Sequence, residues 1–331
     1  MSTTVAAERN LAVEAVRVTE ATALAASRRM GHGDEEDADR AAVDAMQQAL
    51  SNLAIEGTIR IGEGSKKETA KLYTGEAVGS GDGPKVDVAL LPLEGPTIIA
   101  KGEPNGLSVL AMTQEGGFLA APDIYMEKIA VGGGLPDGVI DIDADPATNL
   151  GELAQARGVD VGDLVVCALD RPRHKELIAR IREAGARIML IGDGDVSGVI
   201  ATTQPDSGVN MYMGIGGARE GVLAAAALGC VGGQMQARLV FRDEAERGRA
   251  VNAGIDDLER TYDVADMASG DVTFATTAVT SGAMLRGVRS DVGRRGIIIT
   301  NSIVMRSSSG TVRYVEAHHN FARKRAPGKD V

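Results

Sequence analysis

The sequence predicts an α/β protein with a parallel sheet and crossover helices. In the second half, short apolar runs that are typical of buried strands lie at 164–170, 187–195 and 209–217. Helical stretches follow them at 171–186, 196–204 and 218–228. A β-α-β-α-β-α order joins strands that point the same way, so helices are expected to cover the faces of a parallel sheet.

Two amphipathic helices and several strands are predicted outside this region. Apolar residues recur near helical spacing in 10–30 and 37–53, and Asn10 can cap the first of these helices. Strands are expected at 58–61, 86–91, 107–113 and 127–131, and again at 272–277, 297–305 and 311–316. The chain contains no internal repeat, so we expect one unit over residues 1–331 with a subdivision near residue 150.

The composition excludes several functional classes. The 331 residues carry 35 basic and 46 acidic side chains, and the net charge of −11 disfavours binding to nucleic acid or anionic membranes. Cys167 and Cys230 lie in apolar runs, which indicates buried thiols rather than a disulfide framework or a zinc site. No apolar run has the length of a membrane span, and residues 1–10 lack the plan of a signal peptide. A cytoplasmic protein is therefore expected.

Acidic residues at the ends of predicted elements are candidate metal ligands. Asp39 lies near a helix start, and Glu63 and Glu94 lie in turns that follow strands. Carboxylates from three such places suit Mg²⁺ or Mn²⁺, which prefer hard oxygen ligands. The alternative is that these are helix-start acids favoured by the macrodipole, together with solvated charges in turns.

Glycines and arginines at the ends of consecutive strands are candidate ligand-binding groups. The stretches GDGDV (192–196) and GIGGAREG (214–221) each end a strand and open a helix, where exposed N–H groups can bind phosphate or sugar hydroxyls. Arg171 and Arg173 flank Pro172 after the preceding strand, and a guanidinium pair suits a phosphoryl group. Since ligands of parallel α/β sheets bind beyond the strand ends, these groups are expected at one rim. Ordinary turns with solvated charges are the alternative.

Ordered motifs along nearly the whole chain resemble the class II fructose-1,6-bisphosphatases of bacteria. They include GTIRIGEG, PLEG, APDIYMEKIAVG, LDRPRHKELI, DGDV and PDSGVNMYMGIGGAREGVLAAAAL. The resemblance implies a layered α/β/α/β/α sandwich of the inositol monophosphatase or sugar phosphatase type. Residues 1–150 would form its metal-binding and catalytic half, and residues 151–331 its sugar-phosphate-binding half. It further implies a homo-oligomer that uses Mg²⁺ or Mn²⁺ to hydrolyse the 1-phosphate of fructose 1,6-bisphosphate in gluconeogenesis.

The resemblance also assigns roles to individual positions. The positions that match substrate-binding residues are Glu94, Gly95, Tyr125, Arg171, Pro172, Arg173, Asp193, Gly194, Asp195 and Gly217. The positions that match metal ligands are Asp39, Glu63, Glu94 and Glu220.

Departures from the family pattern are concentrated at the catalytic positions. Where the family has GEGEKDEAPMLY, this chain has GEGSKKETAKLY, so Ser65 replaces an acid and Lys67 replaces the acid that acts on the catalytic water. In LLPLEGPT, Leu91 replaces a metal-ligand Asp and Pro96 replaces a Thr that helps to activate water. Arg219 replaces the Pro of GGAPEG.

These replacements predict impaired hydrolysis and leave no certain catalytic residue. Leu91 offers no oxygen to a divalent ion, Lys67 repels one, and Pro96 lacks both a hydroxyl group and a backbone N–H. Three functions stay open. The first is an active sugar bisphosphatase, and the second is a silent paralog that binds a sugar phosphate or an active homologue as regulator or scaffold. The third is an enzyme of changed chemistry with Lys67 as acid or base.

Lys67 also allows a binding site without a metal ion. Its ammonium group could take the place of the ion, neutralise one of the candidate acids Glu63, Glu94 and Asp39, and hold phosphate as a point charge. This hypothesis predicts that sugar-phosphate binding is insensitive to EDTA.

Overall fold

The computed structural model describes residues 2–291, 293, 296–321 and 323, and for residues 2–10 it describes the backbone alone. The helices of this part are α1 (Ser2–Ala26), α2 (Glu35–Leu50), α3 (Pro96–Lys101), α4 (Pro146–Arg157), α5 (Lys175–Glu183), α6 (Asp195–Ala201), α7 (Ala218–Val231), α8 (Glu244–Asn252) and α9 (Val264–Met267). The strands are β1 (Glu56–Ile61), β2 (Ala77–Val78), β3 (Lys85–Glu94), β4 (Leu107–Gln114), β5 (Tyr125–Val131), β6 (Val165–Leu169), β7 (Arg187–Ile191), β8 (Met211–Gly217), β9 (Gln234–Val240), β10 (Thr261–Asp263), β11 (Thr273–Ala278), β12 (Arg289–Ser290), β13 (Ile297–Arg306) and β14 (Thr311–Asn320).

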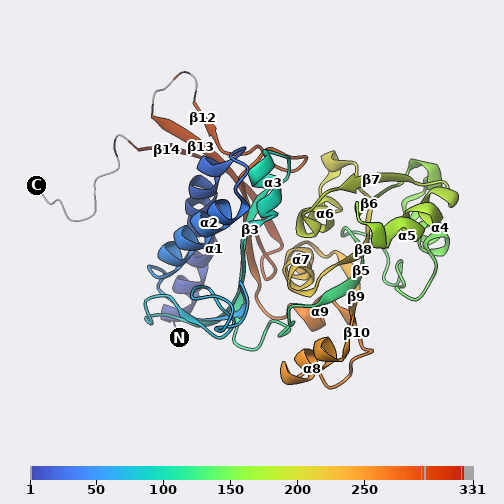
Figure 1. Cartoon of the computed structure of the whole chain (residues 1–331), viewed down its shortest axis with the longest axis horizontal. Coiled ribbons are helices and arrows are strands. Elements are labelled where there is room, and N and C mark those ends of the chain that lie inside the picture. The colour runs from blue at the N-terminus through green and yellow to red at the C-terminus, as the bar shows by residue number, and fades with distance from the viewer. Residues whose placement is uncertain (1, 292, 294–295, 322, 324–331) are drawn as a thin grey trace, which may run out of the picture.

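Two mixed sheets form the framework (Figure 1). The first sheet has eight strands in the order β12-β13-β11-β4-β3-β1-β2, with β14 paired to β13. The second has six strands in the order β10-β9-β5-β8-β6-β7. The chain leaves the first sheet after β4 and returns to it at β11, so the change of sheet does not fall at residue 150. The functional subdivision near residue 150 stays a prediction.

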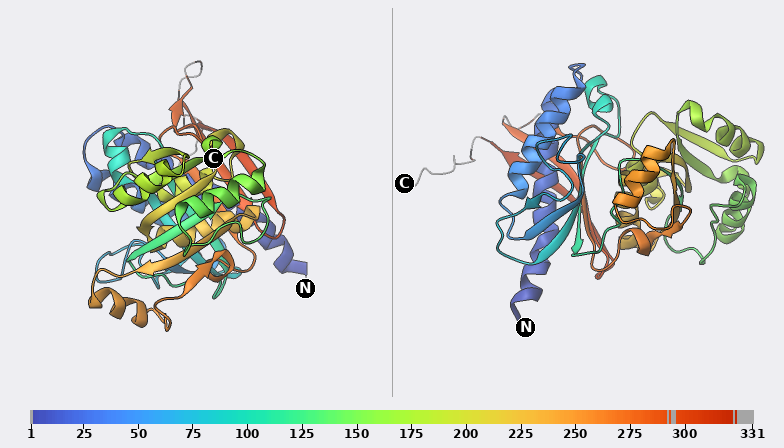
Figure 2. Two further views of the ribbon diagram at one scale, coloured as in Figure 1. Left: turned by 90° about the vertical axis from the view of Figure 1, so that its right-hand side faces the viewer. Right: turned by 60° about the horizontal axis from the view of Figure 1, so that its bottom comes forward.

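The helices lie in three layers around the two sheets. Helices α1 and α2 cover the outer face of the first sheet, α6 and α7 lie between the sheets, and α4 and α5 cover the outer face of the second sheet (Figures 1 and 2). Helix α7 contacts strands of both sheets, and half of its buried residues are alanine, which lets both sheets approach the helix closely. The predicted α/β fold, with helices and sheets in alternating layers, is confirmed.

The parallel sheet predicted for the second half is only partly correct. Strand β6 pairs in parallel with β7 and β8, as the β-α-β order indicated. Strand β5, however, lies between β8 and β9 and is antiparallel to both, and β10 is antiparallel to β9. Strands β8 and β9 are joined through α7 and therefore point the same way, but β5 is inserted between them. Because β5 precedes the alternating region in the chain, the alternation could not show this insertion.

The N-terminal helices differ from the prediction at their starts. Helix α1 begins at Ser2, so Asn10 lies within the helix and not at its cap. Helix α2 begins at Glu35, and the side chain of Asp34 caps it by accepting a hydrogen bond of 2.9 Å from the N–H of Asp37. Asp39 therefore lies inside α2, near its N-terminus.

Both cysteines are buried free thiols, as predicted. Burial raises the pKa of Cys167 and of Cys230 to about 12, so neither forms a thiolate at neutral pH. Among the described residues, every helix is too short or too polar to cross a membrane.

Candidate functional site

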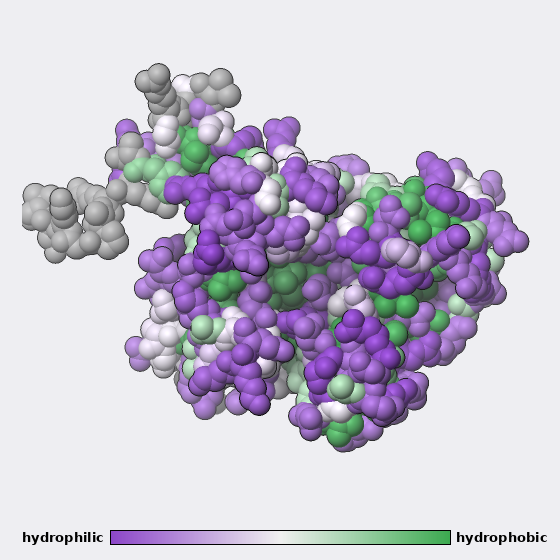
Figure 3. All heavy atoms as spheres, in the orientation of Figure 1, coloured by the Kyte–Doolittle hydropathy of each residue, from purple (hydrophilic) through white to green (hydrophobic). Residues whose placement is uncertain are grey.

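A cavity of about 320 Å³ lies where the ends of strands from both sheets meet. The space-filling view shows a hollow with apolar side chains near the middle of this face of the molecule (Figure 3). The residues that line this cavity, the acidic cavity, include Asp39, Leu91, Glu63, Glu94, Gly95, Pro96, Tyr125, Arg171, Arg173, Asp193, Gly194, Asp195, Gly217 and Glu220. The fold thus gathers every predicted substrate-binding and metal position except Pro172, which lies beside the cavity in a turn of 3₁₀ helix. Their roles in binding stay predictions.

The turn after β3 is shaped by a bulge and by a glycine. The pairing of β3 with β4 shifts between Leu91 and Glu94, and Pro92 lies in this irregular part, where the lack of an N–H is tolerated. The strand therefore reaches Glu94, whereas the sequence predicted that it would end at Leu91. Gly95 has a φ of 76°, and Pro96 then occupies the first turn of α3, where its fixed φ suits the helix.

Glu94 is directed toward the start of α6. Its carboxylate accepts a hydrogen bond of 2.7 Å from the N–H of Val196 and longer ones from the N–H of Ser197. Burial raises the pKa of Glu94 well above its usual range, and Asp195 adds to the increase while the Val196 N–H opposes it. Glu94 thus links the first sheet to α6, and its oxygens already have protein partners.

A buried ion pair lies on the second-sheet side of the cavity. Lys128 from β5 pairs with Asp195, and the Nζ of Lys128 also donates to the carbonyl oxygen of Gly217 at 2.8 Å. The side chains are 1% and 8% exposed. A Cβ on Gly216 would lie 2.0 Å from the Asp195 carboxylate, so the absence of a side chain there makes room for the pair. This arrangement fixes Asp195 at the rim.

Arg173 and His174 hold the ends of β6 and β8 together. Arg173 donates from Nε and Nη2 to the carbonyl oxygen of Ile215, at 3.0 and 2.7 Å, and its guanidinium lies 4.8 Å from the centre of the Tyr125 ring. The N–H of Ile215 donates to Nε2 of His174, so Nδ1 carries the proton and donates to Leu169 O at 2.8 Å. Both ring nitrogens of His174 are thus used to hold β6 and β8 together.

The remaining candidate metal ligands are acids crowded together in a partly buried region. Burial raises the pKa of Glu63 to about 7, with further increases from Asp39 and Glu220 and a decrease caused by Arg219. Burial also raises the pKa of Asp39 and of Glu220. Arg219 donates to the carbonyl oxygen of Gly62 at 2.6 Å, next to Glu63. The structure thus brings these acids near one another, but with a guanidinium among them.

The side chains do not fit the divalent cation that the resemblance implies. Among the described residues, no three His, Cys, Asp or Glu side chains are placed to hold a metal ion together. Leu91 lines the cavity with hydrocarbon, and the oxygens of Glu94 accept backbone hydrogen bonds. We therefore derive no chemical step through a metal ion.

Lys67 does not take the position that the sequence hypothesis gave it. Ser65 and Lys67 lie in an exposed turn. Lys67 lines neither the acidic cavity nor a second cavity beside it, which is described below. The cation that acts on Glu63 is Arg219. The turn directs Lys67 into solvent, whereas Arg219 projects from the first turn of α7 toward Gly62.

Three basic residues of this region were not assigned a role from the sequence. Lys128 shares a face of β5 with the buried residues Met126 and Ala130, and a lysine on such a face is a signal of a buried ion pair. Arg219 was recognised only as a departure from the family pattern. The third is Arg242, whose guanidinium lies 5.2 Å from the centre of the Tyr125 ring. It belongs to none of the motifs quoted above.

The comparison with known proteins agrees with the resemblance. Residues 9–319 match the family model described as bacterial fructose-1,6-bisphosphatase, glpX-encoded. The chain belongs to this family. Fructose-1,6-bisphosphatase 1 class 2 of Escherichia coli (strain K12) is 41% identical over 330 residues, which is 96% of this chain and 97% of that protein. A D-fructose 1,6-bisphosphatase class 2/sedoheptulose 1,7-bisphosphatase of Synechococcus sp. (strain JA-3-3Ab) is 39% identical over 337 residues, which is 94% and 96% of the two chains.

Proposed function

We propose that this member of the family binds a phosphorylated sugar in the acidic cavity and hydrolyses it weakly or not at all. One observation carries the proposal. Arg171, Arg173 and Tyr125 lie around the cavity in the positions of substrate-binding residues, while Leu91 and Pro96 line it where the chemistry needs oxygen-bearing side chains. On this proposal, groups that can bind a phosphoryl group surround the cavity, whereas positions 91 and 96 lack the oxygen atoms that the resemblance assigns to hydrolysis.

The binding part rests on two arginines with donors to spare. Arg173 is oriented by the carbonyl of Ile215 through Nε and Nη2, which leaves Nη1 for a ligand. Arg171 lies 3.8 Å from Asp193, a loose contact that a phosphoryl group can replace. Charge-assisted hydrogen bonds from guanidinium groups are among the strongest that proteins make to phosphate. The ligand class is a sugar phosphate, fructose 1,6-bisphosphate or a similar compound.

The hydrolytic part lacks a group that can activate water. The resemblance places the acid for this role at Lys67, which is exposed and outside the cavity. Pro96 supplies neither a hydroxyl group nor an N–H at the first turn of α3. The chain is therefore a catalytically silent or slow paralog that acts through its ligand or through an active homologue, as regulator or scaffold. A cytoplasmic location and a homo-oligomer are part of this proposal.

Phosphate release from fructose 1,6-bisphosphate with Mn²⁺ tests the hydrolytic part. The chain is compared with a variant that carries Ser65→Glu, Lys67→Asp, Leu91→Asp and Pro96→Thr. We expect turnover far below the usual enzymatic range of about 1 to 1,000 per second, and a gain of activity in the variant. Turnover within that range by the unchanged chain would overturn the proposal of impaired hydrolysis.

Calorimetric titration with fructose 6-phosphate in EDTA tests the binding part. Replacing Arg173 by Met should weaken binding by about 10-fold to 100-fold, because a charge-assisted hydrogen bond is lost. The matched control is Arg187→Met at the start of β7, where the guanidinium contacts the carbonyl of Asp163 outside the cavity. Equal weakening in both variants would contradict a specific role of Arg173.

A further inference from the structure

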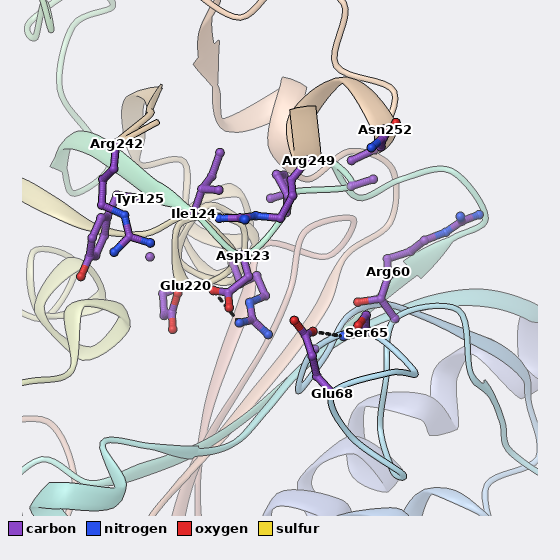
Figure 4. Close-up of a pocket in the computed structure, with 18 residues that line it drawn as sticks. Arg60, Ser65, Glu68, Asp123, Ile124, Tyr125, Glu220, Arg242, Arg249 and Asn252 are labelled. Atoms are coloured by element: carbon purple, nitrogen blue, oxygen red, sulfur yellow. Dashed lines mark hydrogen bonds and ion pairs between the residues drawn. The ribbon is translucent and has the colours of Figure 1, made fainter. Parts of the chain in front are cut away.

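A second cavity, of about 780 Å³, adjoins the acidic cavity and is lined by four arginines. This arginine cavity lies between the turn after β1, the segment before β5, and α8 (Figure 4). Its arginines are Arg60, Arg219, Arg242 and Arg249. No motif and no position carried over from the family accounts for this group of guanidinium side chains.

The two cavities share a wall. Tyr125, Gly217 and Glu220 line both of them. The Tyr125 ring has the guanidinium of Arg173 at 4.8 Å and that of Arg242 at 5.2 Å from its centre. A ligand that binds at Arg173 in the acidic cavity therefore lies next to the arginine cavity, with Tyr125, Gly217 and the Glu220 carboxylate in the wall between them.

Arg242 and Arg249 leave a positive charge in excess. Both pair with the single carboxylate of Glu246, which is fully buried, with Nε of Arg242 at 2.6 Å and Nη2 of Arg249 at 3.3 Å from Oε1. Two guanidinium groups thus meet one carboxylate. Each arginine side chain is about half exposed and can turn donors toward the cavity.

Arg219 is held in a fixed position on the other side of the cavity. It donates to Gly62 O at 2.6 Å and pairs with Asp123 at 2.6 Å, so it connects the turn after β1 with the segment before β5. Its side chain is 20% exposed, whereas that of Asp123 is 70% exposed. Water screens the Asp123 charge more than the Arg219 charge, and Asp123 can move aside for a stronger anion.

A carboxylate of the chain also lines this cavity. Glu68 lies in the turn opposite Arg249 (Figure 4), and its carboxylate accepts a hydrogen bond of 2.7 Å from the N–H of Ser65. The Ser65 N–H lowers the pKa of Glu68, and Arg219 and Arg249 lower it further. Arg219 and Arg249 therefore favour an anion in this cavity, and Glu68 itself lies in an exposed turn.

We propose that the arginine cavity binds the second phosphoryl group of a sugar bisphosphate without a metal ion, through Arg219 and Arg249. The inference rests on the proposed function, in which the first phosphoryl group binds at Arg171 and Arg173. Guanidinium groups then supply the positive charge that a divalent cation would provide, since the acidic cavity, with Leu91 in its lining, does not fit such an ion. The turn of Glu68 opens as the phosphoryl group enters.

The test compares two ligands in the presence of EDTA. Fructose 1,6-bisphosphate and fructose 6-phosphate are titrated calorimetrically into the full chain and into Arg219→Met. We expect the bisphosphate to bind the chain about 10-fold to 100-fold more tightly than the monophosphate, and Arg219→Met to lose this preference while its affinity for the monophosphate stays unchanged. Arg187→Met, outside both cavities, should keep the preference.

Several outcomes would overturn the inference. One is equal affinity of the chain for the two ligands, and another is a preference that needs Mn²⁺ or survives in Arg219→Met. If Arg219 only connects the turn after β1 with the segment before β5, Arg219→Met should lower the melting temperature and weaken the binding of both ligands equally. Should that variant not fold, Arg249→Met, whose side chain is half exposed, provides the same comparison. Absence of binding by either ligand would instead reject the proposed function, and the inference with it.

Discussion

The two walls of the acidic cavity differ in how their polar groups are satisfied. On the second-sheet wall, Lys128 forms an ion pair with Asp195 and donates to a backbone carbonyl of β8. Arg173 donates to another backbone carbonyl of the same strand. On the first-sheet wall, Glu63 has a pKa raised to about 7 by burial and neighbouring acids, and Leu91 stands among these acids without a polar group. One wall has its charged groups paired within the second-sheet side, whereas the acids of the other wall depend on partners from other elements, Glu94 on the N–H groups of α6 and Glu63 on Arg219 of α7.

The difference shows that the shape of the site is separable from its chemistry. Leu91 packs against the main hydrophobic core, and Pro96 suits the first turn of α3. Each residue is thus compatible with local stability, and under the proposed function each stands where hydrolysis needs an oxygen-bearing side chain.

The largest effect is expected from breaking the buried pair of the second-sheet wall. Lys128→Met should lower the free energy of unfolding by about 3 to 5 kcal/mol, because Asp195 would remain as an unpaired buried charge. Urea denaturation measures the change. The control Arg238→Met, on neighbouring β9, breaks exposed pairs with Glu127 and Asp143 and should cost at most about 1 kcal/mol.

A second variant sharpens this test. Adding Asp195→Asn to Lys128→Met removes the unpaired charge and should recover part of the lost stability. If Lys128→Met and Arg238→Met cost the same, the two walls do not differ in the way that the ion pairs indicate.

An intermediate effect is expected on the first-sheet wall. In EDTA, Leu91→Asp should lower the free energy of unfolding by about 1 to 3 kcal/mol, since it adds a charge beside Glu94 and removes an apolar contact with the core. The control is Leu190→Asp on β7, where the leucine is 38% exposed and the change should stay within about 0.5 kcal/mol. If Leu91→Asp left the free energy of unfolding unchanged, the cavity would tolerate a further acid.

The smallest effect concerns pH. Burial lowers the pKa of His174 below its usual value of 6.5, so the unfolded chain binds a proton that the folded chain does not bind. The contribution of neutral His174 is present above pH 6.5 and is lost as the pH falls toward the lower folded pKa. Unfolding free energies between pH 7.5 and 5 should fall less steeply for His174→Gln, and identical slopes would contradict this linkage.

Local patterns in the sequence determined much of this protein. The alternation of apolar runs and amphipathic stretches indicated β6, β7, β8 and their helices, and glycines at strand ends indicated one rim. The ordered motifs identified the family, and the substitutions at Leu91 and Pro96 were visible without a structure. These features could be predicted because they depend on neighbouring residues and on the fixed geometry of parallel strand ends.

The tertiary structure alone decided which distant groups meet. The sequence did not show that β5 enters antiparallel between β8 and β9, and this insertion is what brings Lys128 to Asp195. Nor did it show that Lys67 would be exposed while Arg219 lies beside Glu63. The physical reason is that periodicity reports which face of an element is buried, whereas the pairing of charges from separate segments depends on how the sheets and helices pack.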